Sequence, residues 1–206
     1  MLSIIELELE LLDMQINAKK SNCLRIGDRC NAPCASIYTA DGRELQWTDT
    51  VKYLGVYLVT AKNFTCSFDN AKKSFYRTFN SIFSKVGRIA SEEVILELVN
   101  KKCMPAMLFG LDACTINKSQ INSLQFAVTG MLMKLFCTRS KDIVNESLHF
   151  FGFSAVDILI YKRQYNFLMK YSIADNLLCH IFANIAVNEL NNVKAKLKEL
   201  DTTRLS

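Results

Sequence analysis

Two kinds of hydrophobic spacing divide the chain. Between residues 15 and 58 the apolar side chains form short runs bounded by turn residues, which is typical of strands. From Ser67 onward they recur every three or four positions, as on one face of a helix. The change of period predicts an α+β fold that is predominantly helical. We expect a small N-terminal antiparallel sheet or hairpin in residues 1–65 and a helical bundle in residues 66–206.

The first region is expected to begin with a short amphipathic helix over residues 1–14, where apolar residues share helical spacing. Further along, Asp41 and Gly42 favour the positive φ angles of a tight hairpin turn. Gly55 lies within a run that is otherwise β-branched and aromatic, which indicates a bulge or a close backbone approach. The expected strands cover residues 21–26, 35–38, 44–47 and 51–58.

The helix expected over residues 67–90 has the clearest pair of faces. Phenylalanines dominate its apolar face, whereas Lys73, Arg77 and Arg88 lie on the opposite one. Pro105 is expected to break or restart the helical pattern further along the chain. The other helices are expected over residues 91–102, 118–136, 141–150, 154–171 and 175–200.

Composition agrees with an ordered chain. Of the 206 residues, 50% are hydrophobic and 22% are charged, which is enough apolar material for a real core. The formal net charge of +5 permits an acidic partner such as nucleic acid without requiring one. Charge alone therefore leaves the class of partner open.

The cysteines and the apolar runs bear on the compartment. The chain has eight cysteines but no Cys-x-x-Cys pair, so we expect reduced thiols and neither a zinc site nor a disulfide framework. The N-terminus carries acids where a secretory leader carries bases. The longest charge-free stretch, residues 119–133, is too short to span a bilayer. We expect a soluble, intracellular chain with no membrane partner, and leave nucleus and cytoplasm open.

Catalytic motifs are sparse. We find no nucleophile elbow, phosphate-binding loop, dinucleotide-binding turn or zinc-peptidase helix. The aspartates occur singly, whereas two-metal phosphoryl transfer needs converging carboxylates. His149 and His180 are expected to be partly buried structural residues. We therefore assign no catalytic residue, no metal ligand and no cofactor to this chain.

The basic face of the 67–90 helix is the main physical lead toward a function. Lys73, Arg77 and Arg88, with Lys85 at the margin, have the spacing to follow a phosphate backbone while the phenylalanines pack inward. Any surface helix also has a solvated polar face. The pattern alone does not choose between these two interpretations.

Several short segments occur in an order that is typical of one protein family. They are MQINAKKS at residues 14–21, KYLGV at 52–56, FYR at 75–77, MKLF at 133–136 and FGF at 151–153. In this order they resemble the back end of the reverse transcriptase of LINE-type (non-LTR) retrotransposons. The similar part runs from the end of the palm through the primer-grip hairpin and the thumb to the following helical region. It covers nearly the whole chain.

The resemblance implies roles for particular residues. Lys20 matches a motif lysine near the phosphates of the incoming nucleotide. The turn of the KYLGV segment matches the hairpin that steadies the primer end, and the 67–90 helix matches the thumb helix that faces the template–primer duplex. The nucleic-acid-binding residues expected from the residues and the resemblance together are Lys20, Tyr53, Leu54, Gly55, Lys73, Arg77 and Arg88.

The resemblance also implies what the chain lacks. In the family, paired aspartates that hold Mg²⁺ precede the segment that resembles residues 14–21, and this chain begins just before that segment. We therefore expect an RNA-directed DNA polymerase fragment that contacts template–primer RNA or DNA weakly and does not polymerise nucleotides alone.

Two other functions remain open. One is a helical protein-interaction module with no nucleic-acid role. The other is an active polymerase completed by a separate chain that carries the missing half. Loss of that half would also expose apolar surface near residues 51–58 and the first helix, which favours self-association.

Overall fold

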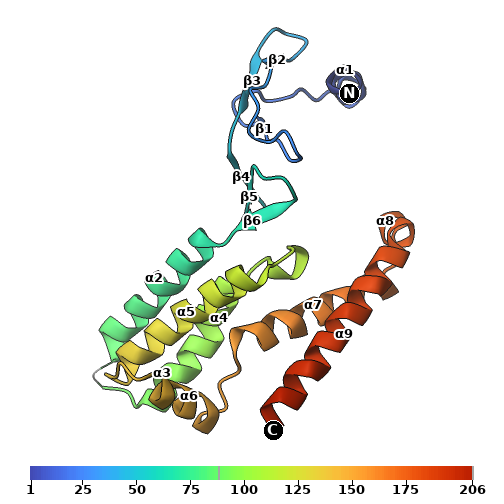
Figure 1. The fold of residues 1–206 in the computed structure, drawn as a ribbon. Helices are drawn as coiled ribbons and strands as arrows, with labels where there is room; N and C mark the ends of the chain where they lie inside the picture. The colour runs from blue at the N-terminus through green and yellow to red at the C-terminus, as the bar shows by residue number, and fades with distance from the viewer. Residues whose placement is uncertain (88, 206) are drawn as a thin grey trace. The chain divides into compact units, whose positions relative to one another are not determined.

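The computed structural model describes residues 1–87 and 89–205. The chain divides into two compact units, residues 1–67 and 68–206. The strands lie in the first unit and most of the helices lie in the second (Figure 1). The predicted α+β, predominantly helical class is therefore confirmed.

The first unit contains one helix and two small sheets. In one sheet the central strand β3 pairs parallel with β1 and antiparallel with β2, and in the other sheet β5 pairs antiparallel with β4 and β6. The predicted hairpin at Asp41 and Gly42 joins β2 to β3, with Gly42 at φ +75°. The elements are α1 (Leu2–Glu10), β1 (Asn22–Cys23), β2 (Ile37–Tyr38), β3 (Glu44–Trp47), β4 (Thr50–Tyr53), β5 (Val56–Val59) and β6 (Thr65–Ser67).

The prediction of a single strand over residues 51–58 is wrong. The chain reverses inside this segment, so that Tyr53 pairs with Val56 across a two-residue turn. Leu54 at φ +46° and Gly55 at φ +87° both adopt the left-handed backbone that such turns require. The periodicity hid the turn because Leu54 is an unusual residue there, although the resemblance to the primer-grip segment implied a hairpin at this place.

In the residues that the structure describes, the second unit consists of helices joined by turns and short loops. Its elements include a π-helical turn, η1, and a 3-10 turn, η2. In chain order they are α2 (Asp69–Val86), α3 (Glu92–Leu98), η1 (Val99–Cys103), α4 (Met104–Met107), η2 (Leu111–Ala113), α5 (Lys118–Leu135), α6 (Lys141–Phe150), α7 (Val156–Ile173), α8 (Leu177–Ile181) and α9 (Ala183–Leu205).

Local sequence signals explain where several of these helices begin and end. α5 begins with a capping box, in which the Asn117 side chain accepts from the Gln120 backbone N–H at 2.8 Å and the Gln120 side chain accepts from the Asn117 N–H at 3.0 Å. Pro105 is the second residue after the π-helical turn η1, so its missing N–H coincides with the change of helix type between α3 and α4 and does not end the helical backbone. The helix predicted over residues 175–200 is two helices, α8 and α9, which are separated at Phe182.

Buried apolar side chains lie on several helices of the second unit. Phe75 and Phe79 of α2 are 0% and 1% exposed, and α2 lies in contact with α4 and α5. One cluster of buried side chains lies between α7 and α9 and contains Leu168, Ala186, Leu190 and Val193. α7 is also fastened to the segment after α4, because the Arg163 guanidinium donates to the Leu108 carbonyl at 3.2 Å.

The cysteines and the histidines differ in their exposure to solvent. All eight cysteines are free, and Cys66, Cys103 and Cys114 are buried. Burial raises the pKa of the Cys103 thiol to about 11. His149 and His180 are exposed, so the expectation that they are partly buried is wrong. In the described part of the chain, no helix combines the length and the apolar character needed to cross a membrane.

Candidate nucleic-acid interface

The α2 helix carries both a core face and a charged face. Phe75 and Phe79 recur at four-residue spacing and are buried, while Asp69 lies in the first turn, where the helix dipole favours an acid. No other acid occurs between Asp69 and Val86. The predicted division of this helix into an apolar and a basic face is confirmed.

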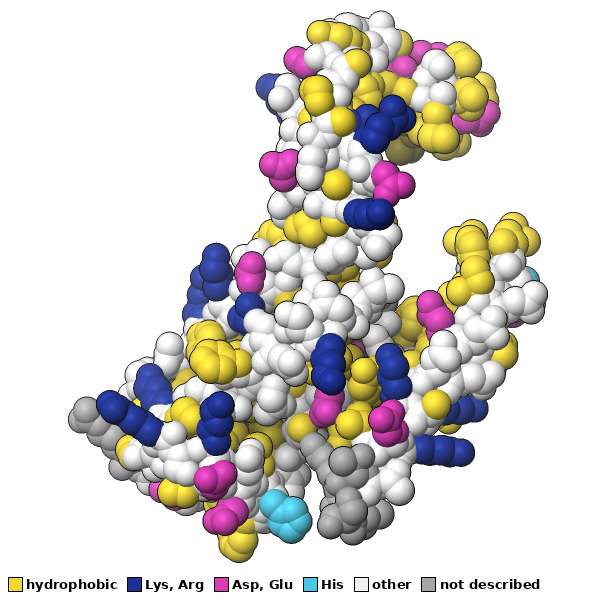
Figure 2. All heavy atoms as spheres, in the orientation of Figure 1, with side chains coloured by type: hydrophobic (Ala, Val, Ile, Leu, Met, Phe, Trp, Pro, Cys, Tyr) yellow, Lys and Arg dark blue, Asp and Glu magenta, His cyan; other side chains and the backbone are white. Residues whose placement is uncertain are grey.

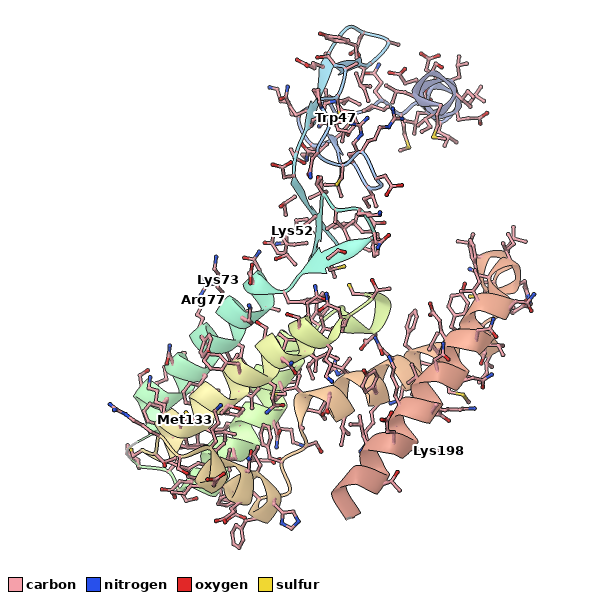
Figure 3. The ribbon with its side chains drawn as sticks, viewed as in Figure 1. Trp47, Lys52, Lys73, Arg77, Met133 and Lys198 are labelled. Atoms are coloured by element: carbon pink, nitrogen blue, oxygen red, sulfur yellow. The ribbon has the colours of Figure 1, made fainter. Side chains whose placement is uncertain are left out.

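Lys73 and Arg77 form the centre of the basic face. Both side chains are exposed and extend from the same side of α2 (Figure 3). Among the described residues, neither makes an ion pair or a hydrogen bond through its side chain. Their four-residue separation is a rise of about 6 Å along the helix, close to two phosphate steps of about 3.4 Å along one strand of a duplex. The pair therefore suits successive contacts with one phosphate backbone.

The neighbouring Lys72 is half-buried and already paired. Its ammonium lies 2.9 Å from the Asp69 carboxylate and donates to the Ser123 hydroxyl at 3.0 Å. Its side chain is only 28% exposed. Lys72 therefore fastens α2 to α5, whereas Lys73 beside it is available to an external anion.

Lys134 is a functional candidate that the sequence analysis missed. It is an exposed residue of α5, and its ammonium donates to the Asn80 side-chain oxygen of α2 at 3.0 Å. It also lies 5.2 Å from the centre of the Phe83 ring and 5.8 Å from that of Phe79. Since 54 residues separate Lys134 from Asn80, only the packing of α5 on α2 reveals that the basic face extends over both helices.

The remaining cations of this face are less central. Lys85 is exposed near the end of α2, at the margin of the face as expected. Arg88 lies outside the described residues. Lys and Arg side chains gather over α2 in the space-filling view (Figure 2). We define the basic face as Lys73, Arg77, Lys85 and Lys134.

The first unit places Tyr53, Leu54 and Gly55 together at the end of the β4–β5 hairpin. The Tyr53 side chain is 62% exposed and that of Leu54 is 79% exposed. The tight turn therefore presents two large side chains to solvent. The left-handed backbone of Leu54 costs about 1–2 kcal/mol relative to an ordinary conformation. A non-glycine residue held in this region is a feature that clusters at functional sites.

Lys20 lies in a separate turn of the first unit. The Lys20 N–H donates to the Asn17 carbonyl at 2.9 Å, and the Lys19 N–H donates to the Asn17 side chain at 3.1 Å. The Lys20 side chain is exposed. The expected residues thus form three local groups: the Lys20 turn and the hairpin end in the first unit, and the basic face in the second.

The candidate residues are cations in both units and an exposed hairpin end in the first unit. In the part of the chain that the structure describes, no three His, Cys, Asp or Glu side chains gather into a group that can hold a metal ion. Comparisons with protein-family models, with curated proteins and with solved structures find no match to this chain.

Proposed function

We propose that this chain is part of a retrotransposon reverse transcriptase, an RNA-directed DNA polymerase, and that it binds the template–primer duplex through the basic face. The observation that carries the proposal is that Lys73 and Arg77 are exposed and have no side-chain partner within the described part of the chain, on a helix that has no acid beyond its first turn. Such side chains favour phosphate oxygens over neutral ligands, and they read no base sequence.

The hairpin end and Lys20 fit the same function. Tyr53 and Leu54 offer exposed apolar surface against a terminal base pair or sugar, and the neighbouring strands fix the turn that carries them. Lys20 adds an exposed ammonium next to a backbone turn. We propose these as contacts to the primer end and to phosphate, and the basic face as the contact to the duplex.

We propose that the chain does not polymerise nucleotides by itself. Joining a nucleotide to a primer requires carboxylates that hold two metal ions about 3.5–4 Å apart. The 206 residues contain no adjacent pair of aspartates. We expect no primer extension by the purified chain in the presence of Mg²⁺ and a homopolymer template, and extension would overturn this part of the proposal.

The binding proposal is tested by the salt dependence of affinity. We would measure the dissociation constant for a fluorescent RNA–DNA duplex between about 50 and 200 mM salt, because each phosphate contact contributes a slope of about −0.9 in log K against log salt. The test variant is Lys73→Gln with Arg77→Gln. The matched control is Lys62→Gln with Lys101→Gln, since both of these lysines are exposed and already paired, with Asp28 and Glu97 respectively.

Both double variants lower the formal charge of +5 by two, so they differ only in which cations are lost. We expect the test variant to flatten the slope by about 1.8 and the control to leave it nearly unchanged. Equal slopes for the wild type and the test variant would show that the basic face is only solvated.

A second candidate function is a helical protein-interaction module. It is favoured by a separate observation, the apolar side chains exposed on and around α8. This function predicts no retention of the wild-type chain on a heparin column at about physiological salt, where the first proposal predicts retention.

A further inference from the structure

The hairpin of α7 and α9 ends in an exposed apolar surface, which we call the α8 tip. Figure 2 shows hydrophobic side chains gathered over α8. Each member exposes between 47% and 78% of its surface, although all are large aliphatic or aromatic residues. The α8 tip consists of Ile173, Leu177, Leu178, Ile181, Phe182 and Ile185.

The α8 tip is held in place by polar contacts beneath it. The Tyr171 hydroxyl donates to the Leu178 carbonyl at 3.1 Å, which joins the end of α7 to α8. The Asn176 side chain caps α8 by accepting from the Leu178 N–H at 2.9 Å. Below the tip, α7 and α9 pack through their own buried cluster. The apolar side chains therefore project from a supported helical end.

The surface of the α8 tip carries almost no charge. Between residues 172 and 188 the only formally charged side chain is Asp175, and its carboxylate lies 3.2 Å from the His180 imidazole. Nucleic acid and anionic lipid surfaces are recognised by lysine and arginine, and this segment contains neither. Two copies of this surface, in contrast, bring together only one carboxylate each, and each of these lies beside its own His180.

The area of the α8 tip matches what a dimer needs. The six exposed fractions correspond to roughly 650 Å² of apolar surface, slightly more than the ~300–600 Å² patch of a typical monomer. A standard protein–protein interface buries about 800 Å² on each partner. One α8 tip with a polar rim around it supplies an area of this size.

We propose that the α8 tip is a homodimer interface, in which it docks against the α8 tip of a second copy of this chain. In such an isologous contact each residue meets its counterpart around a two-fold axis. This places the contact at the end of the α7–α9 hairpin, not near residues 51–58 or the first helix, where loss of a polymerase half would expose apolar surface. The inference does not depend on nucleic-acid binding.

The test is the mass of the full chain in solution. We would measure it by sedimentation equilibrium from roughly 1 to 100 μM protein, a range that covers the weaker interfaces of standard size. The wild type is expected to approach twice 23.4 kDa. The test variant is Leu177→Glu with Ile181→Glu, at positions that are 74% and 62% exposed in the monomer. The control is Phe126→Glu, which places one glutamate at a 73% exposed phenylalanine of α5.

We expect the test variant to remain monomeric, with a dissociation constant raised at least about 100-fold, because it buries unpaired charge in the contact. The control should dimerise like the wild type, and far-UV circular dichroism should show that all three chains are folded. A monomeric wild type, or a test variant that still dimerises, overturns the proposal. If that monomeric wild type also binds neutral phosphatidylcholine vesicles through these residues, the occupant of the α8 tip is a lipid surface and not a second copy of the chain.

Discussion

Replacing Leu54 by asparagine is expected to stabilise the first unit. Leu54 sits at φ +46°, a conformation that costs an ordinary L-residue about 1–2 kcal/mol and that asparagine tolerates far better. The substitution also removes a side chain that is 79% exposed, so only about a fifth of a leucine's burial, roughly 0.4 kcal/mol, is lost. The net expectation is a gain of about 1 kcal/mol in the free energy of unfolding.

The single tryptophan makes this effect measurable. Trp47 belongs to β3 in the first unit, and its indole N–H donates to the Ala35 carbonyl at 2.9 Å. Its fluorescence should therefore follow the unfolding of this unit in urea. With a slope of about 1 kcal/mol per molar, a gain of that size raises the midpoint by about 1 M. Far-UV circular dichroism, which is dominated by the helices of the second unit, should move much less.

The control is Leu54→Ala, which deletes the same side chain but lacks the short polar group through which asparagine bonds the local backbone in the left-handed region. We expect no stabilisation from alanine, because the backbone strain remains. Equal midpoints for the asparagine and alanine variants, or a lower midpoint for asparagine than for the wild type, would refute the argument that the turn is strained at Leu54.

Two further predictions concern the second unit. Replacing Asn117 by alanine should cost about 1 kcal/mol of stability, measured as a lower urea midpoint by circular dichroism, whereas Asn117→Asp should keep most of the cap. Cys103 should react with iodoacetamide at pH 8 much more slowly than the exposed Cys137, because burial raises its pKa to about 11 and the thiolate is the nucleophile. Because folding raises this pKa, the protonated Cys103 thiol contributes its full stabilisation below about pH 9. The free energy of unfolding then falls by up to about 3 kcal/mol as the pH rises through 11. Cys103→Ala should abolish this alkaline loss, and a wild-type midpoint that stays constant relative to the variant over this range would contradict it.

The sequence predicts those parts of the fold that local patterns govern. The two faces of α2 follow from the spacing of Phe75 and Phe79, and the β2–β3 hairpin follows from Asp41 and Gly42, because each signal acts within a few residues. The turn at Leu54 escapes this reasoning, since no local rule favours leucine at positive φ.

Local sequence patterns also fail to predict part of the candidate site, for a different reason. Lys134 joins the basic face only because α5 packs on α2, and sequence spacing does not encode that contact. Likewise, neighbouring lysines with the same chemistry differ in availability: Lys72 is bound to Asp69 and Ser123, whereas Lys73 is exposed. Helical periodicity identifies the face, and tertiary packing decides which cations on it are available.

The position of Lys134 has a consequence for how this face would meet a ligand. The Lys134 side chain is already held by the Asn80 oxygen and by two aromatic rings. Part of the roughly 2 kcal/mol of rotamer entropy that a lysine side chain loses on being ordered is therefore lost before any ligand binds. Lys73 and Arg77 still have that freedom and lose it only on contact. If the basic face binds phosphate as proposed, the Lys134 ammonium would already be in position, whereas the Lys73 and Arg77 side chains would be ordered only on contact.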